Sequence, residues 1–473
     1  LLLVMALAVS LRLVGIDWGG ANLLHPDERF LAMVTASLEP NDQLFDYFDT
    51  ATSTLNPENV GSRPNFVYGT YPLIIVRLIG EATGWTGFLE LKAVGRLAST
   101  GWDLLTIWMV YLLGARLADR RTGLLAAFFL AATVLHIQQS HYFTVDLAQT
   151  FFVTLALYLA VRISETGPQD QGPDGTSVRA HLSEARLGIS LVFGLVAAAA
   201  VAAKLSAAPV VLLLPAAHAL RLLGRDRERT GEALLPTLVV LAASGLVFGI
   251  AFRVLQPYAF IGPGFFDIGL NPRWSKAIDG LRSLTGPEAD WPPAMQWARR
   301  SVLYSGKNLV WWGFGLPLGL LALTGLAAGV RQVLRRGAGP LTLAVAWGLG
   351  YLSWQSLANN PTMRYQLPVY PTLAFFAAWL IIRWRRQKSG VGLRRVAAAV
   401  GVVVGVATLV YAIAFAGIYR RPVTRDAGSR WLFAEVPGPI NLMVDTSDGM
   451  RRQPVALPYD TPLASGATIS TRT

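Results

Sequence analysis

Two adjacent carboxylates, Asp27 and Glu28, follow the first apolar segment of the chain in the sequence His25-Pro26-Asp27-Glu28. Pro26 suits the first turn of a helix, and a helix N-terminus stabilises negative charge. An ionised carboxylate at this place could accept the proton of a substrate hydroxyl as a general base. We therefore take Asp27 and Glu28 as candidate catalytic residues. The alternative interpretation is a solvated helix cap without a catalytic role.

Three cations, Arg96, Lys204 and Arg364, lie at the ends of separate apolar segments. A guanidinium fork matches phosphate oxygens, and an ammonium supplies a movable point charge, so the three are candidates for binding a phosphate. The alternative is that each side chain extends to the lipid headgroups, which is common near helix ends. That alternative is weakest for Arg364, because few other cations fall on its side of the membrane.

Further polar residues lie at the same segment boundaries and are expected to support the site: His25, Asp103, His141, Asp146 and Tyr365. Asp103 follows Arg96 by about two helical turns and could balance its charge. Charges near a bilayer are costly unless they are paired or functional. Their convergence on one side of the membrane therefore predicts a polar cavity there.

The sequence offers little for metal or cofactor chemistry. It contains no cysteine, which excludes disulfides, thiol nucleophiles, iron–sulfur clusters and cysteine-ligated zinc. The spacing of His136 and His141 is poor for two zinc ligands on one helical face, so polar packing is the better interpretation. We expect no resident cofactor. A divalent cation at Asp42, Asp46 and Asp49 is the alternative to three solvated loop carboxylates.

The elements that must position these residues are membrane helices. Of the 473 residues, 53% are hydrophobic and 15% are charged, against about 25% charged in soluble domains. Crossing a membrane takes about 20 apolar residues of helix. The first apolar stretch has no basic region or cleavage site of a signal peptide, so we expect the remainder of a first span. The fold class is all-α and polytopic, with eleven predicted spans: 1–16, 98–116, 123–138, 145–163, 187–203, 207–223, 233–254, 309–330, 340–358, 368–384 and 395–418.

The basic residues set the predicted orientation, because short cytoplasmic loops carry an excess of Lys and Arg. If the first span runs from inside to outside, the short outer turns hold only Lys204 and Arg364, and the inner loops hold clusters of arginine. The net charge of +12 is then an orientation signal from loops that touch anionic lipid, and it does not require nucleic acid as a partner. We expect a multi-pass protein of the plasma (inner) membrane with its active site facing outside.

Three segments on the predicted outer side are too long to be turns: 17–92, 255–308 and 421–473. The first predicts two interfacial helices, over 25–38 and 71–82. The second is rich in Pro, Gly and Trp and predicts an irregular loop that lies on the membrane like a lid; its tryptophans suit an interfacial belt or, alternatively, stacking on a sugar. The third predicts the start of a soluble, partly β domain, so residues 1–420 form the membrane domain.

The chain resembles the GT-C glycosyltransferases that use polyprenyl-phosphate-linked sugars, in particular the protein O-mannosyltransferases and the lipid A aminoarabinose transferases. The resemblance covers about residues 1–420. Four motifs carry it: His25-Pro26-Asp27-Glu28, Gly95-Arg96-Leu97, Thr144-Val145-Asp146, and Arg364-Tyr365 with Pro368 and Pro371.

The resemblance implies an inverting transfer of a hexose or pentose from a polyprenyl-phosphate carrier to a hydroxyl of a glycan, lipid or protein. It implies that Asp27 deprotonates the acceptor and that Glu28 orients the acceptor or the loop. Arg96, Lys204 and Arg364 would hold the carrier phosphate and stabilise the charge that grows on it. The loop at 255–308 and the tail depart from the mannosyltransferases, which weighs against a protein acceptor.

Two other classes of function fit the same composition. A transporter or lipid flippase also has many spans, but transporters place broken helices and charges near the membrane midplane, whereas here the charge gathers at one end. A catalytically silent GT-C scaffold protein would use the tail to bind a partner. The presence of both Asp27 and Glu28 favours the enzyme.

Overall fold

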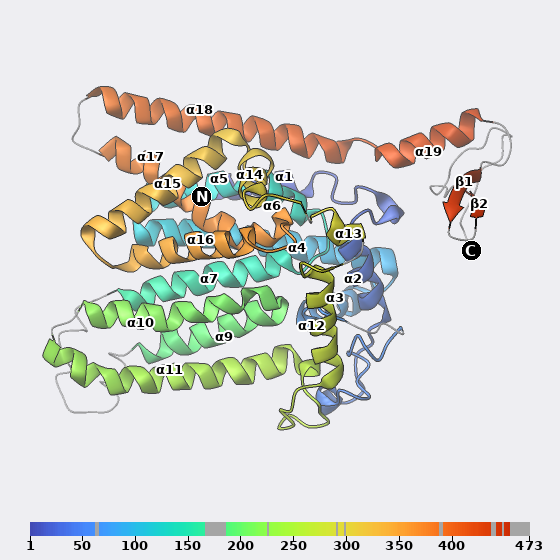
Figure 1. Cartoon of the computed structure of the whole chain (residues 1–473), viewed down its shortest axis with the longest axis horizontal. Coiled ribbons are helices and arrows are strands. Elements are labelled where there is room, and N and C mark those ends of the chain that lie inside the picture. Colours follow the sequence, from blue (N-terminus) through green and yellow to red (C-terminus); the bar gives the residue numbers. More distant parts are fainter. Residues whose placement is uncertain are drawn as a thin grey trace.

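The apolar segments fold into a bundle of helices in the computed structural model, which describes residues 1–61, 66–165, 186–224, 227–289, 292–297, 299–386, 391–436, 441–446 and 449–454 (Figure 1). Lipid offers no partners for backbone polar groups, so each segment must satisfy them as a helix. The bundle consists of α1 (Leu2–Leu13), α4 (Phe88–Leu117), α5 (Arg120–Ala131), α6 (Val134–Ser140), α7 (Asp146–Ser164), α9 (Leu187–Ala203), α10 (Leu213–Leu223), α11 (Arg227–Leu255), α15 (Leu316–Arg336), α16 (Pro340–Ser356), α17 (Tyr370–Arg386) and α18 (Val391–Ala416).

Shorter elements connect and cover the bundle. The helices outside it are α2 (Pro26–Ser37), α3 (Thr70–Thr83), α12 (Pro272–Thr285), α13 (Pro292–Met295), α14 (Tyr304–Asn308) and α19 (Thr424–Glu435). The 3₁₀ or π elements are η1 (Gly20–Asn22), η2 (Leu44–Phe48), η4 (Leu205–Leu212), η5 (Pro257–Ala259), η6 (Leu309–Gly313), η7 (Met363–Val369) and η8 (Gly417–Arg420). Two strands, β1 (Asn441–Thr446) and β2 (Gly449–Pro454), pair antiparallel.

The helical, polytopic fold class is confirmed. Each of the eleven predicted spans coincides with a helix, or with two consecutive helical elements, of the described residues. Among the described helices, seven are long and apolar enough to cross a membrane, or eight if α5 and α6 count as one bent span. Two shorter apolar helices, α1 and α9, lie among them. The chain is therefore a multi-pass membrane protein.

The centre and the periphery of the bundle differ in burial. The most apolar window of Met363–Arg386, which contains α17, is 89% buried, whereas the corresponding windows of Thr230–Leu255 and Arg394–Glu435 are 22% buried. α17 packs against α5 and α15, and α11 and α18 lie along opposite edges of the bundle (Figure 1). Thus α17 is a central helix, and α11 and α18 expose apolar side chains at the rim, where the lipid would lie.

The predicted span 123–138 is broken into α5 and α6, which meet at a bend of 59°. At the break the backbone of Thr133 is extended, and its hydroxyl donates to the carbonyl oxygen of Phe129 at 2.7 Å. Such a bond to the preceding turn favours bending of a helix. The bend allows α6 to carry Gln138 and Gln139 to the wall of a cavity.

The two ends of the bundle have different character. α2, α3 and α12 gather at one end, which we call the site end, on the right of Figure 1. The turn from α15 to α16, the C-terminal end of α17 and the N-terminal end of α18 lie at the opposite end (Figure 1). The last turns of α15 and α17 contain arginines at that end, including Arg335, Arg336 and Arg383. The basic clusters and the polar residues of the candidate site are thus at opposite ends, as the charge pattern predicts.

The long segments that are predicted to lie outside contain more regular structure than the sequence indicates. In place of a wholly irregular loop, 255–308 forms α12, whose N-terminus is capped by the Asn271 side chain accepting from Arg273 N at 2.9 Å. The spacing of Ile278, Leu281 and Thr285, which line one cavity, is the helical signal that the Pro and Gly content hides. In 421–473 the described residues form α19 and the β1–β2 hairpin; the rest of the predicted domain lies outside them.

Candidate functional site

Asp27 and Arg364, which are far apart in the sequence, form an ion pair at the site end. Asp27 lies in the first turn of α2, where the side chain of His25 caps the helix, and Arg364 lies in η7 just before α17. Both side chains are partly enclosed, with exposed fractions of 15% and 17%. The Nε atom of Arg364 is buried and has no hydrogen-bond partner in the described part of the chain. Arg364 therefore keeps a donor free for a further acceptor.

A second ion pair extends this centre. Nζ of Lys204 lies 2.6 Å from Oδ1 of Asp146 at the start of α7, and 4.5 Å from the ring centre of Tyr365. The guanidinium of Arg364 lies over the same ring at 5.4 Å. Tyr365 is therefore placed beside both cations. The structure brings together Asp27, Asp146, Lys204, Arg364 and Tyr365 from four separate parts of the sequence.

The environment of Asp27 keeps it ionised. Burial would raise the pKa of Asp27, but the charge and hydrogen bond of Arg364 outweigh this effect, so the pKa lies below its ordinary value. Burial lowers the pKa of His25, against the opposing charge of Asp27, so the imidazole is neutral at neutral pH. Burial, and then the charge of Asp27, raise the pKa of the Tyr68 hydroxyl. Sequence analysis missed Tyr68, because no pattern in the loop marks it.

Glu28 and Arg96 form a separate, fully buried pair. Nε and Nη2 of Arg96 lie 2.7 and 2.8 Å from the two carboxylate oxygens of Glu28, and the exposed fractions are 2% and 0%. Nη1 donates to the carbonyl oxygens of Ile16 and Trp18, and Phe143 N donates to Glu28 at 2.9 Å. α4 begins at Phe88, so Arg96 lies well inside the helix and not at its end. In the structure Arg96 joins Glu28 to two carbonyl oxygens of the loop, and it lines neither cavity described below.

Asp103 lies away from the site, although the sequence indicates a supporting role beside Arg96. Its carboxylate is 2.5 Å from Nε of Arg12 and 2.5 Å from Nδ1 of His136, and all three side chains are completely buried. This network joins α1, α4 and α6. Sequence analysis assigned no role to Arg12. Its ion pair could have been expected, because a lone charge within an apolar segment is costly unless it is paired.

His141 also has a structural position. Its ring stacks on Tyr419 with centroids 3.5 Å apart, and its nitrogens lie 2.7 and 2.9 Å from the carbonyl oxygens of Ile137 and Val14. These contacts tie the end of α6 to the end of α1 and to η8. His141 therefore connects elements of the site end without lining either cavity described below.

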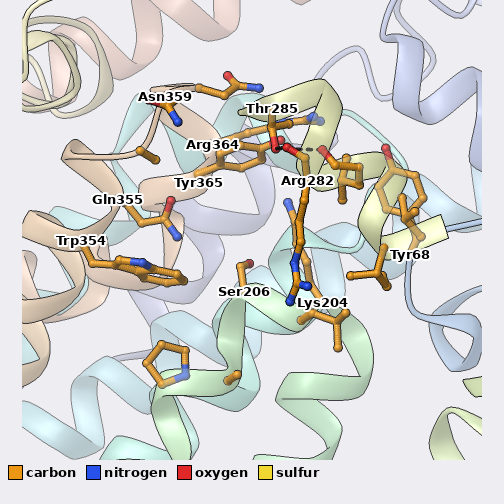
Figure 2. Close-up of a pocket in the computed structure, with 18 residues that line it drawn as sticks. Tyr68, Lys204, Ser206, Arg282, Thr285, Trp354, Gln355, Asn359, Arg364 and Tyr365 are labelled. Carbon is orange, nitrogen blue, oxygen red and sulfur yellow. Dashed lines mark hydrogen bonds between the residues drawn. The ribbon is translucent and has the colours of Figure 1, made fainter. Parts of the chain in front are cut away.

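Two cavities meet at Arg364. The first, the cation cavity, has a volume of about 630 Å³ and is lined by Lys204, Arg364, Tyr365 and mainly apolar residues (Figure 2). Figure 2 shows Tyr68 and Trp354 on opposite sides of it, and Arg282 of α12 adds a cation that sequence analysis missed. The second, the carboxylate cavity, has a volume of about 580 Å³ and contains His25 and Asp27. Arg364 lines both.

This arrangement combines an anion site with a proton acceptor. Lys204 and Arg364 present positive charge at one cavity, and an ionised carboxylate faces the other. Within the described residues, no group of three or more His, Asp or Glu side chains could hold a metal ion, and Asp42, Asp46 and Asp49 do not form one.

Known proteins share this architecture. Residues 86–171 match the family described as dolichyl-phosphate-mannose-protein mannosyltransferase. No curated protein sequence matches the chain significantly. The apo oligosaccharyltransferase of Archaeoglobus fulgidus superimposes with a TM-score of 0.59 and 14% identity, over 92% of this chain but 58% of its own length. The chain thus spans less than two thirds of that enzyme.

Two similar structures contain a lipid phosphate. ArnT from Cupriavidus metallidurans bound to undecaprenyl phosphate has a TM-score of 0.53 and 17% identity, over 93% of this chain and 81% of its own. The archaeal oligosaccharyltransferase AglB from Archaeoglobus fulgidus, in complex with an inhibitory peptide and a dolichol-phosphate, has a TM-score of 0.54 and 14% identity, over 92% of this chain and 57% of its own. The fold is that of the GT-C glycosyltransferases, which confirms the resemblance.

Proposed function

We propose that this GT-C-fold chain transfers a sugar, with inversion, from a polyprenyl-phosphate carrier to a hydroxyl acceptor at the outer face of the plasma (inner) membrane. One observation carries the proposal: Arg364 lies between the two cavities and pairs with Asp27. One side chain can thereby connect the carrier phosphate with the base. The undecaprenyl phosphate in ArnT and the dolichol-phosphate in AglB support a donor of this class.

The cation cavity suits a phosphate that is attached to a long apolar chain. Its lining from η4 and α16 includes Leu205, Pro209 and Trp354. Farther along the same two elements, away from the site end, the exposed side chains include Leu212 and Leu349. A polyprenyl chain could follow this apolar surface into the bilayer while its phosphate reaches Lys204 and Arg364.

The reaction would use the two cavities together, in a single step. The acceptor oxygen attacks the anomeric carbon and loses its proton to Asp27, while the bond from that carbon to the phosphate oxygen breaks and its electrons remain on the phosphate. Lys204 and Arg364 stabilise this charge more strongly as it grows. Because the phosphate competes with Asp27 for Arg364, donor binding would weaken the Asp27 ion pair and raise the proton affinity of the base.

Replacement of Arg364 by leucine tests the anion site. We expect binding of undecaprenyl phosphate to weaken by roughly 10- to 100-fold, since a hydrogen bond to a charged group contributes about 1.5–3 kcal/mol. Affinity can be measured with purified protein in nanodiscs. Arg273→Leu is the matched control, because Arg273 is exposed on α12 and lines neither cavity. If Arg364→Leu bound undecaprenyl phosphate as tightly as Arg273→Leu does, Arg364 would have no role in binding the phosphate. Binding without transfer of sugar from any undecaprenyl-phosphate hexose or pentose would favour a flippase or a scaffold.

A cysteine at position 359 tests the orientation of the membrane domain. Asn359 lines the cation cavity at the site end, and the chain has no other cysteine. We expect a membrane-impermeant maleimide to label Asn359→Cys in intact cells. The control is Leu334→Cys, because Leu334 is strongly exposed at the opposite end of the bundle. Labelling of Leu334→Cys alone would reverse the proposed orientation.

A further inference from the structure

The carboxylate cavity is lined by amides and aromatic rings and carries little unpaired charge. The amides come from Gln138, Gln139 and Asn308, and the rings from Tyr142, Trp297, Tyr304 and Trp312. Among its lining residues, the charged Asp27 and Arg364 are paired with each other. Among the described lining residues, Arg364 is the one Lys or Arg that an anionic group could meet, and Asp27 already pairs with it. The lining favours a neutral, polar ligand.

Aromatic pairs stand on two different parts of the lining. The rings of His25 and Tyr142 have centroids 4.9 Å apart, and those of Trp297 and Tyr304 have centroids 5.6 Å apart. The first pair comes from the start of α2 and the end of α6, and the second from the segment between α13 and η6. Ring faces offer flat apolar surfaces, and each neighbouring amide offers both donors and an acceptor. Sugar rings have this same combination of apolar C–H faces and hydroxyl edges.

The amide of Gln139 has a buried acceptor atom without a hydrogen-bond partner among the described residues. This atom is Oε1, and the residue is 4% exposed. Buried polar groups are normally paired with protein or with ordered water, so this oxygen could accept from a ligand hydroxyl that displaces water. Gln139 lines the same cavity as Asp27. A polyhydroxyl ligand could donate one hydroxyl to Gln139 while it presents another to the base.

From these observations we infer that the acceptor is a neutral carbohydrate, so that the product is a new glycosidic bond between two sugars. The inference rests on the proposed function and specifies its acceptor. The acceptor hydroxyl gives its proton to Asp27, its oxygen bonds to the anomeric carbon of the donor, and the carrier phosphate leaves. Serine or threonine peptides and long-chain alcohols are the competing acceptors.

The test offers all acceptor classes together. Purified protein in nanodiscs is incubated with radiolabelled undecaprenyl-phosphate hexoses and pentoses and with neutral tetrasaccharides of glucose, mannose, galactose and arabinose, a serine/threonine peptide, and a long-chain alcohol. We expect label in a tetrasaccharide, with equal release of undecaprenyl phosphate. Transfer to the peptide or the alcohol alone would overturn this inference and leave the proposed function intact. Absence of any donor turnover would overturn both.

Two neighbouring tryptophans provide a matched pair of variants. Trp312 lines the carboxylate cavity and Trp311 does not, although both are exposed on η6. Trp312→Leu and Gln139→Leu are expected to raise KM for the tetrasaccharide by roughly tenfold, with a smaller change in kcat, because they remove contacts to the acceptor. Trp311→Leu should leave this KM unchanged. An equal KM for all three variants and the parent would overturn the inference even if a sugar is transferred.

Discussion

Replacement of Asp27 by asparagine is expected to lower kcat for sugar transfer by about 10²- to 10⁴-fold, the usual contribution of a general base. Asparagine has nearly the same shape as aspartate, and its carbonyl oxygen could still accept from Arg364, so the local packing should remain. The amide cannot take up the acceptor proton. Initial rates of label transfer at saturating donor and acceptor would measure the effect. A variant that transfers sugar as fast as the parent would show that Asp27 is not the base.

Donor binding provides the control for this variant. Because Asp27 and the carrier phosphate would compete for Arg364, Asp27→Asn should bind undecaprenyl phosphate at least as tightly as the parent does. A large loss of affinity would instead indicate that the substitution disturbs the anion site. Normal binding with lost transfer would separate a chemical role of Asp27 from a structural one.

The dependence of the parent enzyme on pH follows from the same ion pair. Arg364 outweighs the effect of burial and keeps the pKa of Asp27 below its ordinary value. The carboxylate is the active form of a base, so kcat/KM should be constant through neutral pH and fall only below a pH of about 4. The acidic limb of kcat should lie at higher pH, since donor phosphate draws Arg364 away. Coincident limbs would contradict this competition.

The helical fold was predictable because membrane insertion acts on single segments. Each run of about 20 apolar residues must become a helix on its own, so length and composition are sufficient. The break between α5 and α6 was not predictable in this way, because the apolar pattern continues through Thr133 and only its bond to Phe129 marks the bend. Likewise α12 is short and amphipathic, and its signal is weaker than that of a span.

The site was predictable only in part, because the sequence does not distinguish an ion pair that is fully enclosed from one that lines a cavity. Arg96 and Arg364 both occur near predicted boundaries, yet Arg96 is enclosed by Glu28 and two loop carbonyls, and Arg364 lines two cavities. The difference arises from contacts between residues that are distant in sequence. Arg282 was missed for the same reason, since it belongs to no motif and gains its place through tertiary structure.

The buried pair of Glu28 and Arg96 leads to the largest expected effect on stability. Arg96→Met would leave the Glu28 carboxylate without its cation at a place with no exposure to solvent. Breaking one side of a buried ion pair costs about 3–5 kcal/mol. The carbonyl oxygens of Ile16 and Trp18 would also lose a donor. We expect a clear fall in the midpoint of thermal unfolding in detergent, together with loss of transfer, because Glu28 adjoins Asp27.

Two further variants identify the cause of that loss. Arg116→Met removes a half-exposed cation that pairs with Glu165, and such a surface pair contributes only about 0–1 kcal/mol. The double variant Glu28→Gln with Arg96→Met should recover part of the lost stability, since no unpaired charge remains buried. Its transfer rate should stay low, because residue 96 then no longer joins Glu28 to the loop carbonyl oxygens beside Asp27. If Arg96→Met were no less stable than Arg116→Met, the ion pair would not be holding the loop. If the double variant regained full activity, Glu28 would have no positioning role.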